Sequence, residues 1–363
     1  MQRYEKRLAN LRRVMEKTNL DVLLLTGKSN IFYTTGVNFY WQPLNVLLNS
    51  WNAVVLTPER ASLVIFFAEM EHAMNVNWME KCQYREVGGA ISQVRDLIGS
   101  ARCIGVEGNI VSRNLQQFLS DSMPNSKFED AEALISQVRM FKTDDEIELL
   151  RVASKIADIG LEAATKSVDV DVPEYEVAIA AESAMGAAKM SDFAFKTTVA
   201  SGKRSGQAGN WLATDAKIPN NSSIWIDMGP SYEGYASDST RTVYLGNVST
   251  ELLKIRSTVL TARDLAEKSV QIGRPTHGMH NVVLRVMQEA GYEKYMFHPS
   301  HGLGIDVVEP PFIWEENAPN FGTGMTFTIE IGIHIPDVGG YRIEDVYILQ
   351  EGCLEKLTQS ALP

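Results

Sequence analysis

Two aspartates, Asp227 and Asp238, enclose a stretch rich in Gly, Pro, Ser and Tyr between two predicted strands. The strand patterns cover residues 222–226 and 240–245, so the segment is expected to form a β-hairpin. Asp beside Gly and Ser is also ordinary turn chemistry, and the hairpin alone leaves that interpretation open. A carboxylate at the inner end of a buried strand is costly unless a charge compensates it, and a metal ion would do so.

Three later segments supply further side chains that can bind metals. His301 lies in a glycine-rich turn, and Glu330 and Glu344 each lie within an apolar strand pattern. Arg241 and Arg342 are too few to neutralise four carboxylates. Four carboxylates with one imidazole and no thiolate suit divalent Mn, Co, Fe or Zn, and they are enough to bridge two such ions. The expected ligands of two divalent metal ions are Asp227, Asp238, His301, Glu330 and Glu344.

The order of these motifs along the chain resembles a known family. The matching segments are residues 227–242, 301–304, 327–330 and 340–345. They resemble the pita-bread metallohydrolases, the group of Xaa-Pro dipeptidase, aminopeptidase P, creatinase and methionine aminopeptidase. The resemblance implies an α+β pita-bread catalytic domain with a curved antiparallel sheet over residues 136–363. It also implies an α/β creatinase-like N-terminal domain over residues 1–135.

The resemblance further implies how the ligands divide between two ions. Asp227 and Asp238 would bind one ion, and His301 and Glu330 would complete the other. Asp238 and Glu344 would bridge the two, and Glu330 is the expected proton shuttle. The implied activity is that of a dinuclear hydrolase of the Xaa-Pro dipeptidase or aminopeptidase type. In such an enzyme a metal-bridged hydroxide attacks a C–N bond of a small peptide or amide.

Two positions depart from the peptidase pattern. Peptidases of this group carry a histidine before the first metal-binding strand, whereas residues 203–211 contain none. They carry a second histidine where this chain has Val308, ahead of Glu309. Those histidines normally contact the scissile amide and its tetrahedral intermediate, and one missing donor costs about 100-fold to 1,000-fold in rate. The amide-cleaving groups are therefore expected to differ from those of the peptidases.

Other side chains are candidates for the missing functions. His334 lies four residues after Glu330 and shares its strand face if the strand is regular. Asp306 is a candidate base, and Arg342 is expected to hold either Glu344 or a substrate carboxylate. The expected catalytic residues are Glu330, His334, Arg342 and Asp306. The expected substrate-binding residues are Trp211, Asn210, Val308, Tyr40 and Trp41.

Three classes of function remain open. The first is the dipeptidase-type hydrolase. The second is a non-peptidase of the same fold, either a small-molecule amidohydrolase of the creatinase type or a lyase such as a dimethylsulfoniopropionate lyase. An aromatic wall at Trp211 would suit the compact cation of such a substrate. The third is an inactive binding protein, against which four costly buried carboxylates argue.

Charge and cysteine usage exclude several partners and settings. The 363-residue chain has a formal net charge of −11, which argues against nucleic acid or an anionic membrane as its partner. Cys82, Cys103 and Cys353 are scattered and odd in number, which favours a reduced, cytoplasmic setting. The N-terminus lacks an apolar signal core, and no apolar run reaches membrane-spanning length. A homodimer is expected by analogy with the two-domain relatives.

Helical and strand periodicities place these residues on a two-domain frame. Residues 4–15 show helical spacing, and strand and helix patterns then alternate as far as residue 107. Thr143 and Glu146 predict a capping box that opens the second domain. Further helices are expected after Pro173 and at two later places, with strands in the intervals. The later helices are expected over residues 251–272 and 279–290.

Overall fold

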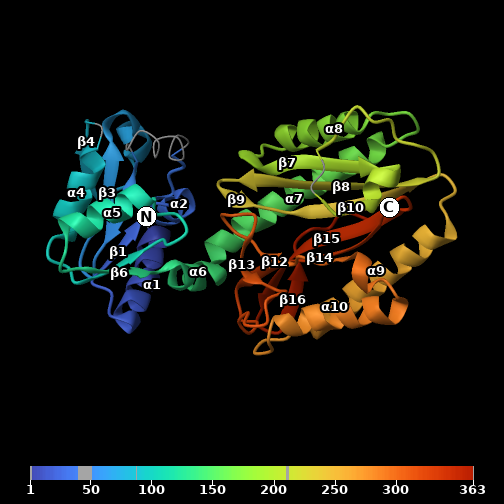
Figure 1. The fold of residues 1–363 in the computed structure, drawn as a ribbon. Helices are drawn as coiled ribbons and strands as arrows, with labels where there is room; N and C mark the ends of the chain where they lie inside the picture. Colours follow the sequence, from blue (N-terminus) through green and yellow to red (C-terminus); the bar gives the residue numbers. More distant parts are fainter. Residues whose placement is uncertain (1, 40–50, 87, 210–211, 363) are drawn as a thin grey trace. The chain divides into compact units, whose positions relative to one another are not determined.

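The computed structural model describes residues 2–39, 51–86, 88–209 and 212–362. The chain forms two compact units, Met1–Arg139 and Met140–Pro363, each with its own β-sheet (Figure 1). Among the described residues, no helix combines the length and the apolar character needed to cross a membrane.

The first unit is an α/β domain built on a mixed sheet. Its strands are β1 Val22–Leu25, β2 Ala53–Leu56, β3 Ala61–Phe66, β4 Glu80–Tyr84, β5 Cys103–Val106 and β6 Lys127–Asp130. Its helices are α1 Gln2–Thr18, α2 Lys28–Thr35, η2 Phe67–Ala73, α4 Gly89–Ile98, α5 Arg113–Ser122 and α6 Glu132–Met140. The strand order is β4-β3-β2-β1-β5-β6, with β1, β5 and β6 parallel and the β1–β2 and β2–β3 pairs antiparallel. The predicted α/β class of this unit is confirmed.

The second unit holds an antiparallel sheet with helices on one side. Its helices are α7 Asp144–Ser167, α8 Glu174–Ala187, η3 Gly202–Gly206, α9 Thr250–Ser269, α10 His277–Ala290 and η4 Glu293–Tyr295. Its strands are β7 Asp192–Ser201, β8 Ser222–Tyr232, β9 Tyr235–Ala236, β10 Ser239–Leu245, β11 Met296–Phe297, β12 His301–Gly302, β13 Glu309–Phe312, β14 Met325–Ile335, β15 Gly339–Gln350 and β16 Cys353–Lys356. The main strand order is β13-β12-β14-β15-β10-β8-β7. This arrangement confirms the predicted α+β class with a curved antiparallel sheet.

Two local predictions about this unit are also confirmed. The β8 and β10 strands form the antiparallel hairpin, with Asp227 paired to Thr240. The capping box forms at the start of α7, where the Thr143 backbone N–H donates to Glu146 Oε2 at 2.9 Å. The acidic first turn of α7 also complements the helix dipole.

Two helix pairs pack on this sheet, α7 and α8 beside β7 and β8, and α9 and α10 beside β14 (Figure 1). The α7 and α8 pair packs on Ile224, Ile226 and Met228 of β8. The α9 and α10 pair packs on alternate isoleucines of β14, beginning with Ile329. Because successive side chains of a strand point to opposite faces, the residues between these apolar positions face away from the helices. That second face carries the candidate site.

Candidate metal centre

A single row of residues crosses four neighbouring strands of the second sheet. Asp227 of β8 pairs with Thr240 of β10, and Thr240 pairs with Glu344 of β15. Glu344 in turn pairs with Glu330 of β14. Neighbouring strands lie about 4.8 Å apart, so Asp227 and Glu330 would be separated by about 14 Å in a flat sheet. Their carboxylates approach each other because the sheet is curved toward this face.

The carboxylates and His301 converge into two groups of metal-binding atoms. Asp238, His301 and Glu344 form one group, and Asp227, Glu330 and Glu344 form the other. Within each group the ligand atoms lie within 4.8 Å of one another, and all five residues are buried. Glu344 belongs to both groups. Within 4.8 Å, Glu330 groups with Asp227 and His301 groups with Asp238, and the expected division of the ligands between two ions stays a prediction.

The His301 imidazole has the orientation of a metal ligand. Its Nδ1 lies 3.0 Å from the carbonyl oxygen of Gly302, which can only accept a hydrogen bond. Nδ1 therefore carries the proton, and Nε2, which carries the lone pair, lies 3.7 Å from Asp238 Oδ2 and 4.0 Å from Glu344 Oε1, so that a cation could lie between these three acceptors. Burial lowers the pKa of His301 and so favours the neutral ring. A ligand histidine whose other nitrogen donates to a carbonyl is the usual arrangement at protein metal sites.

The electrostatics of the cluster favour a bound cation. Burial raises the pKa of Asp238 and Glu344 well above the usual range, and the neighbouring carboxylates raise it further. Burial also raises the pKa of Glu330 to about 7. One buried oxygen on each of Asp227, Asp238 and Glu344 has no hydrogen-bond partner in the described residues. These unpartnered oxygens and the hard ligand set fit divalent metal ions.

Arg342 is held inside the cluster. Its guanidinium lies 2.5 Å from Asp227 Oδ2 and 3.6 Å from Glu330 Oε1. The side chain is fully buried, between the rings of Trp225 at 4.3 Å and Phe297 at 5.3 Å. The close partners of the guanidinium are thus Asp227 and Glu330, whereas Glu344 or a substrate carboxylate was expected.

The other residues singled out in the sequence lie at varied places. His334 is 4% exposed, on the same face of β14 as Glu330, and its Nδ1 lies 2.8 Å from the Ser205 carbonyl oxygen. Asp306 lies in the loop after β12 and is half-buried, and Val308 is 49% exposed. The remaining predicted substrate-binding residues lie outside the described residues. They are Tyr40, Trp41, Asn210 and Trp211.

A buried ion pair lies near the turn that carries His301, and the sequence analysis did not predict it. Lys142 Nζ lies 2.8 Å from Glu309 Oε1, with side-chain exposures of 1% and 7%. The pair connects the segment before α7 to β13, which is paired with β12. The two residues are 167 positions apart, so no local pattern could have linked them.

Replacing Lys142 by methionine is expected to lower the free energy of unfolding by about 3 kcal/mol, because the Glu309 carboxylate would lose its buried cation. Lys203→Met is the matched control, since Lys203 and Asp337 form an exposed pair at 77% and 82% exposure. Exposed pairs contribute less than about 1 kcal/mol. Urea unfolding measures both values, and equal losses would contradict the assignment of a structural role to Lys142.

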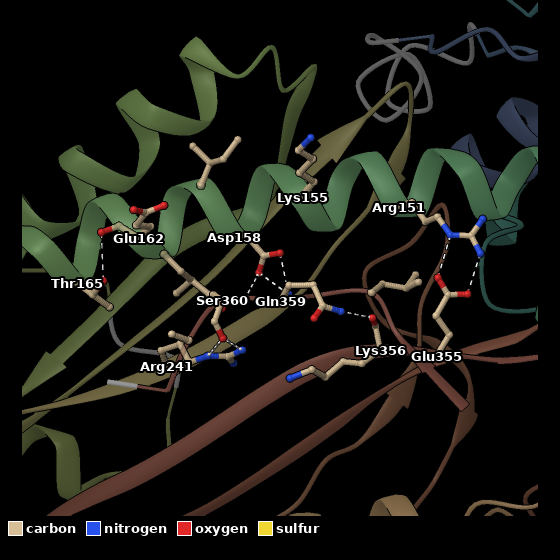
Figure 2. Close-up of a pocket in the computed structure, with 14 residues that line it drawn as sticks. Arg151, Lys155, Asp158, Glu162, Thr165, Arg241, Glu355, Lys356, Gln359 and Ser360 are labelled. Atoms are coloured by element: carbon tan, nitrogen blue, oxygen red, sulfur yellow. Dashed lines mark hydrogen bonds and ion pairs between the residues drawn. The ribbon is translucent and has the colours of Figure 1, made fainter. Parts of the chain in front are cut away.

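A separate cavity of about 830 Å³ lies between α7 and the segment after β16 (Figure 2). Its charged side chains mostly bind one another or the backbone, as Arg151 does with Glu355 at 2.7 Å and Asp158 with the Ser360 N–H at 2.7 Å. Arg241 lines it and donates to the Glu344 carbonyl oxygen at 2.8 Å. The cavity contains neither group of metal-binding atoms. Arg241 is the lining residue that supports the backbone of β15, through its hydrogen bond to Glu344.

Comparison with known proteins identifies the family. Residues 148–351 match metallopeptidase family M24, and residues 7–141 match the creatinase/prolidase N-terminal domain. The chain is 27% identical to the Xaa-Pro dipeptidase of Pyrococcus furiosus over 98% of both chains. It is 30% identical to the putative dipeptidase YkvY of Bacillus subtilis over 92% of both chains.

Solved structures show the same fold over nearly the whole chain. The prolidase of Pyrococcus horikoshii superposes with a TM-score of 0.89 at 26% identity, covering 98% of this chain and 99% of that one. The Xaa-Pro dipeptidase of Bacillus anthracis gives a TM-score of 0.88 at 26% identity and covers 99% of both chains. With the carboxylate and histidine groups in place, the chain belongs to metallopeptidase family M24 in its two-domain form and is a metallohydrolase.

Proposed function

We propose that the protein hydrolyses the C–N bond of an Xaa-Pro dipeptide or a similar small amide with two divalent metal ions. The observation that carries the proposal is the pair of buried ligand groups that share Glu344. Asp227, Asp238, His301, Glu330 and Glu344 would hold the two ions, and Glu344 belongs to both groups of ligand atoms. Relatives named Xaa-Pro dipeptidase support the choice of substrate.

The chemistry divides between the ions and the side chains. When bound, the ions would polarise the substrate carbonyl and lower the pKa of a water molecule toward neutrality. Glu330 is the proposed proton carrier, because its buried carboxylate belongs to a ligand group and would lie beside a water molecule at the ions. Through its two ion pairs, Arg342 favours the charged forms of Asp227 and Glu330 and holds them in place.

His334 is the proposed replacement for one of the absent histidines. Its Nδ1–H donates to the Ser205 carbonyl oxygen, so Nε2 carries a lone pair, and that atom has no partner among the described residues. A Cβ added to Gly332 would lie 2.8 Å from Nε2. Gly332 lies between His334 and Glu330 on one strand face, so Nε2 lies toward Glu330. Burial lowers the pKa of His334 to about 4, and the neutral ring can accept an N–H from the substrate.

His334→Asn is expected to lower kcat/KM by about tenfold to 100-fold, since loss of one hydrogen bond to a buried partner costs about 1–3 kcal/mol. The asparagine amide can still donate to the Ser205 carbonyl oxygen but supplies no group at the Nε2 position. Metal content should remain unchanged. His72→Asn, at an exposed position in the first unit, is the control. Full activity of His334→Asn would show that Nε2 plays no part in turnover.

A second candidate function is hydrolysis of a small non-peptide amide. It is favoured by the position of Val308, which is 49% exposed where the peptidases carry a histidine that contacts the scissile amide. The ligand groups would be the same, and the difference would lie in substrate recognition.

A metal-reconstitution assay tests both candidates. The protein is stripped with chelator, Mn, Co, Zn or Fe is added back, and cleavage of an Xaa-Pro dipeptide panel is followed. Asp238→Ala serves as the inactive control. Metal-dependent cleavage that is lost in the control would support the dipeptidase. Stoichiometric metal binding without peptide cleavage would contradict it and favour the non-peptide substrate.

A further inference from the structure

Two strands in the middle of the second sheet, β10 and β15, are joined by little backbone pairing. β14 pairs with β15 along its whole length. Among the described residues, β10 and β15 are in register only at Thr240 and Glu344. Beyond that pair, the Thr242 hydroxyl accepts from the Arg342 N–H at 3.0 Å and donates to the Arg342 carbonyl oxygen at 2.8 Å. We call this boundary the β10–β15 seam.

The metal cluster is built across the seam. Asp227 of β8 and Asp238, directly before β10, lie on one side of it. His301 of β12, Glu330 of β14 and Glu344 of β15 lie on the other. Each of the two groups of metal-binding atoms contains residues from both sides. The separation of the strands at the seam therefore sets the spacing of the ligands, however they divide between the ions.

Arg241 ties the two strands together on the face opposite the cluster. Successive side chains of a strand point to opposite faces, and the neighbouring Thr240 directs its hydroxyl to the Glu344 carboxylate. The Arg241 guanidinium is buried and donates to the Glu344 carbonyl oxygen at 2.8 Å. It also pairs with Asp345 Oδ1 at 2.5 Å. Both acceptors belong to β15, so one side chain of β10 supports the backbone of a metal ligand on the other side of the seam.

Residues 357–360, the segment after β16, pack against this arginine. Figure 2 shows Ser360 beside Arg241, and its carbonyl oxygen accepts from Nη2 at 2.9 Å. Thr358 is fully buried, and its hydroxyl donates to Asp345 Oδ1 at 2.8 Å. The same hydroxyl accepts from the backbone N–H of the residue after Asp345 at 3.1 Å. The segment therefore contacts both partners of the buried ion pair.

Asp158 of α7 fastens the end of this segment. Its carboxylate accepts from the Gln359 N–H at 2.7 Å and from the Ser360 N–H at 2.7 Å (Figure 2). Hydrogen bonds to a charged acceptor are stronger than neutral ones. Because β16 pairs with β15 and α7 packs on β8, the segment connects the two sides of the seam. We call residues 357–360, with Asp158 and Arg241, the C-terminal clasp.

We propose that the C-terminal clasp raises the metal affinity of the cluster by holding the two sides of the β10–β15 seam together, and that bound metal in turn stabilises the clasp. The inference rests on the proposed function, because it requires that the cluster bind divalent ions. Like charges on the carboxylates of the two sides oppose closure of the seam, and a cation between them favours it. Coupling between two sites is reciprocal, so the factor is the same in both directions.

Equilibrium dialysis of the metal-free full chain against Co²⁺ measures the effect of the clasp on the metal. Asp158→Ala removes the acceptor that fastens the segment to α7, and Thr358→Val removes the buried hydroxyl with little change in volume. Neither residue belongs to a ligand group. Each variant is expected to bind Co²⁺ about 10-fold more weakly, a typical size for such coupling. Thermal unfolding shows whether each variant folds.

Two matched variants separate the clasp from general effects on the fold. Glu162→Ala removes a carboxylate from the same helix, where Glu162 forms an exposed pair with Lys166 at 2.5 Å, and is expected to bind Co²⁺ as wild type does. Thr358→Ser keeps the hydroxyl and is expected to retain most of the affinity that Thr358→Val loses. If Thr358→Val does not fold, the comparison of Asp158→Ala with Glu162→Ala decides.

Hydrogen exchange of the wild-type protein measures the effect of the metal on the clasp. The N–H groups of Leu357, Gln359 and Ser360 are donors within the clasp, so their exchange reports its opening. Co²⁺ is expected to slow their exchange about 10-fold, the factor expected for the affinity. The Lys189 N–H, which donates to the Gly186 carbonyl oxygen in a turn after α8, is the reference and should exchange equally with and without Co²⁺.

The outcomes distinguish this inference from the proposed function. Wild-type Co²⁺ affinity in folded Asp158→Ala and Thr358→Val would overturn the inference and leave the function intact. Clasp exchange that ignores Co²⁺, or slowing that is equal at Lys189, would also overturn it. A wild-type protein that binds no Co²⁺ would overturn both. Co²⁺ binding that responds to the variants as expected, without cleavage of any amide, would support the inference and overturn the function alone.

Discussion

Replacing Glu344 by glutamine is expected to abolish uptake of both metal ions and to reduce hydrolysis by at least about 1,000-fold, or about 4 kcal/mol of transition-state stabilisation. Glu344 is the residue shared by the two ligand groups, so one substitution affects both. Glutamine preserves the size of the side chain but removes its charge, and a neutral amide is a poor ligand for these ions. Thr240 Oγ1 lies 3.2 Å from Glu344 Oε2. The buried amide of the glutamine would therefore keep a hydrogen-bond partner.

The measurements are metal content after dialysis and kcat/KM on the substrate found by reconstitution. Glu351→Gln is the matched control, because Glu351 is exposed just after β15 and belongs to neither ligand group. The control should keep two ions and full activity. A Glu344→Gln protein that retains both ions would contradict the shared role of this residue.

Much of the fold followed from local patterns. Strand-forming residues on both sides of a Gly, Pro and Ser turn predicted the hairpin that carries Asp227, and the structure pairs β8 with β10 as expected. Thr143 and Glu146 marked the start of α7 because a capping box satisfies backbone groups within one turn. Such signals depend on neighbours in the sequence, so they can be read without knowledge of the tertiary structure.

The arrangement of the site depended on long-range register, which no local pattern specifies. The sequence placed Glu330 in a strand, but its grouping with Asp227 depends on the alignment of four strands and on the curvature of the sheet. The ion pair between Arg342 and Asp227 also depends on long-range register, since the two residues are 115 positions apart.

Removing the metal ions is expected to destabilise the protein more at pH 8.5 than at pH 6.5. In the metal-free folded state, burial raises the pKa of Glu330 to about 7 and raises the pKa of Asp238 and Glu344 well above the ordinary range. In the unfolded chain these groups are ionised above pH 6.5. The folded state therefore holds more protons, and its stability falls as the pH rises through the folded pKa values.

Bound metal ions offset this loss of stability, because they compensate the negative charge of the carboxylates in place of the protons. At about 1,000 times the dissociation constant, one bound ion adds about 4 kcal/mol to the free energy of unfolding. The difference in unfolding free energy between metal-loaded and chelated protein should therefore grow as the pH rises from 6.5 to 8.5. Below pH 6.5 the buried rings of His298 and His334, with pKa values of about 4, act in the opposite direction. The comparison is therefore restricted to higher pH.

Urea unfolding with and without chelator at the two pH values measures the effect. Glu344→Gln provides the control, since it removes one strongly shifted carboxylate and should reduce the pH dependence of the chelated protein. Chelated wild type that is equally stable at pH 6.5 and pH 8.5 would show that Asp238, Glu330 and Glu344 do not retain protons in the folded state. Water or a rearrangement of the strands would then expose these carboxylates in the metal-free protein. The free energy of metal binding would have to come from another source than the compensation of buried charge.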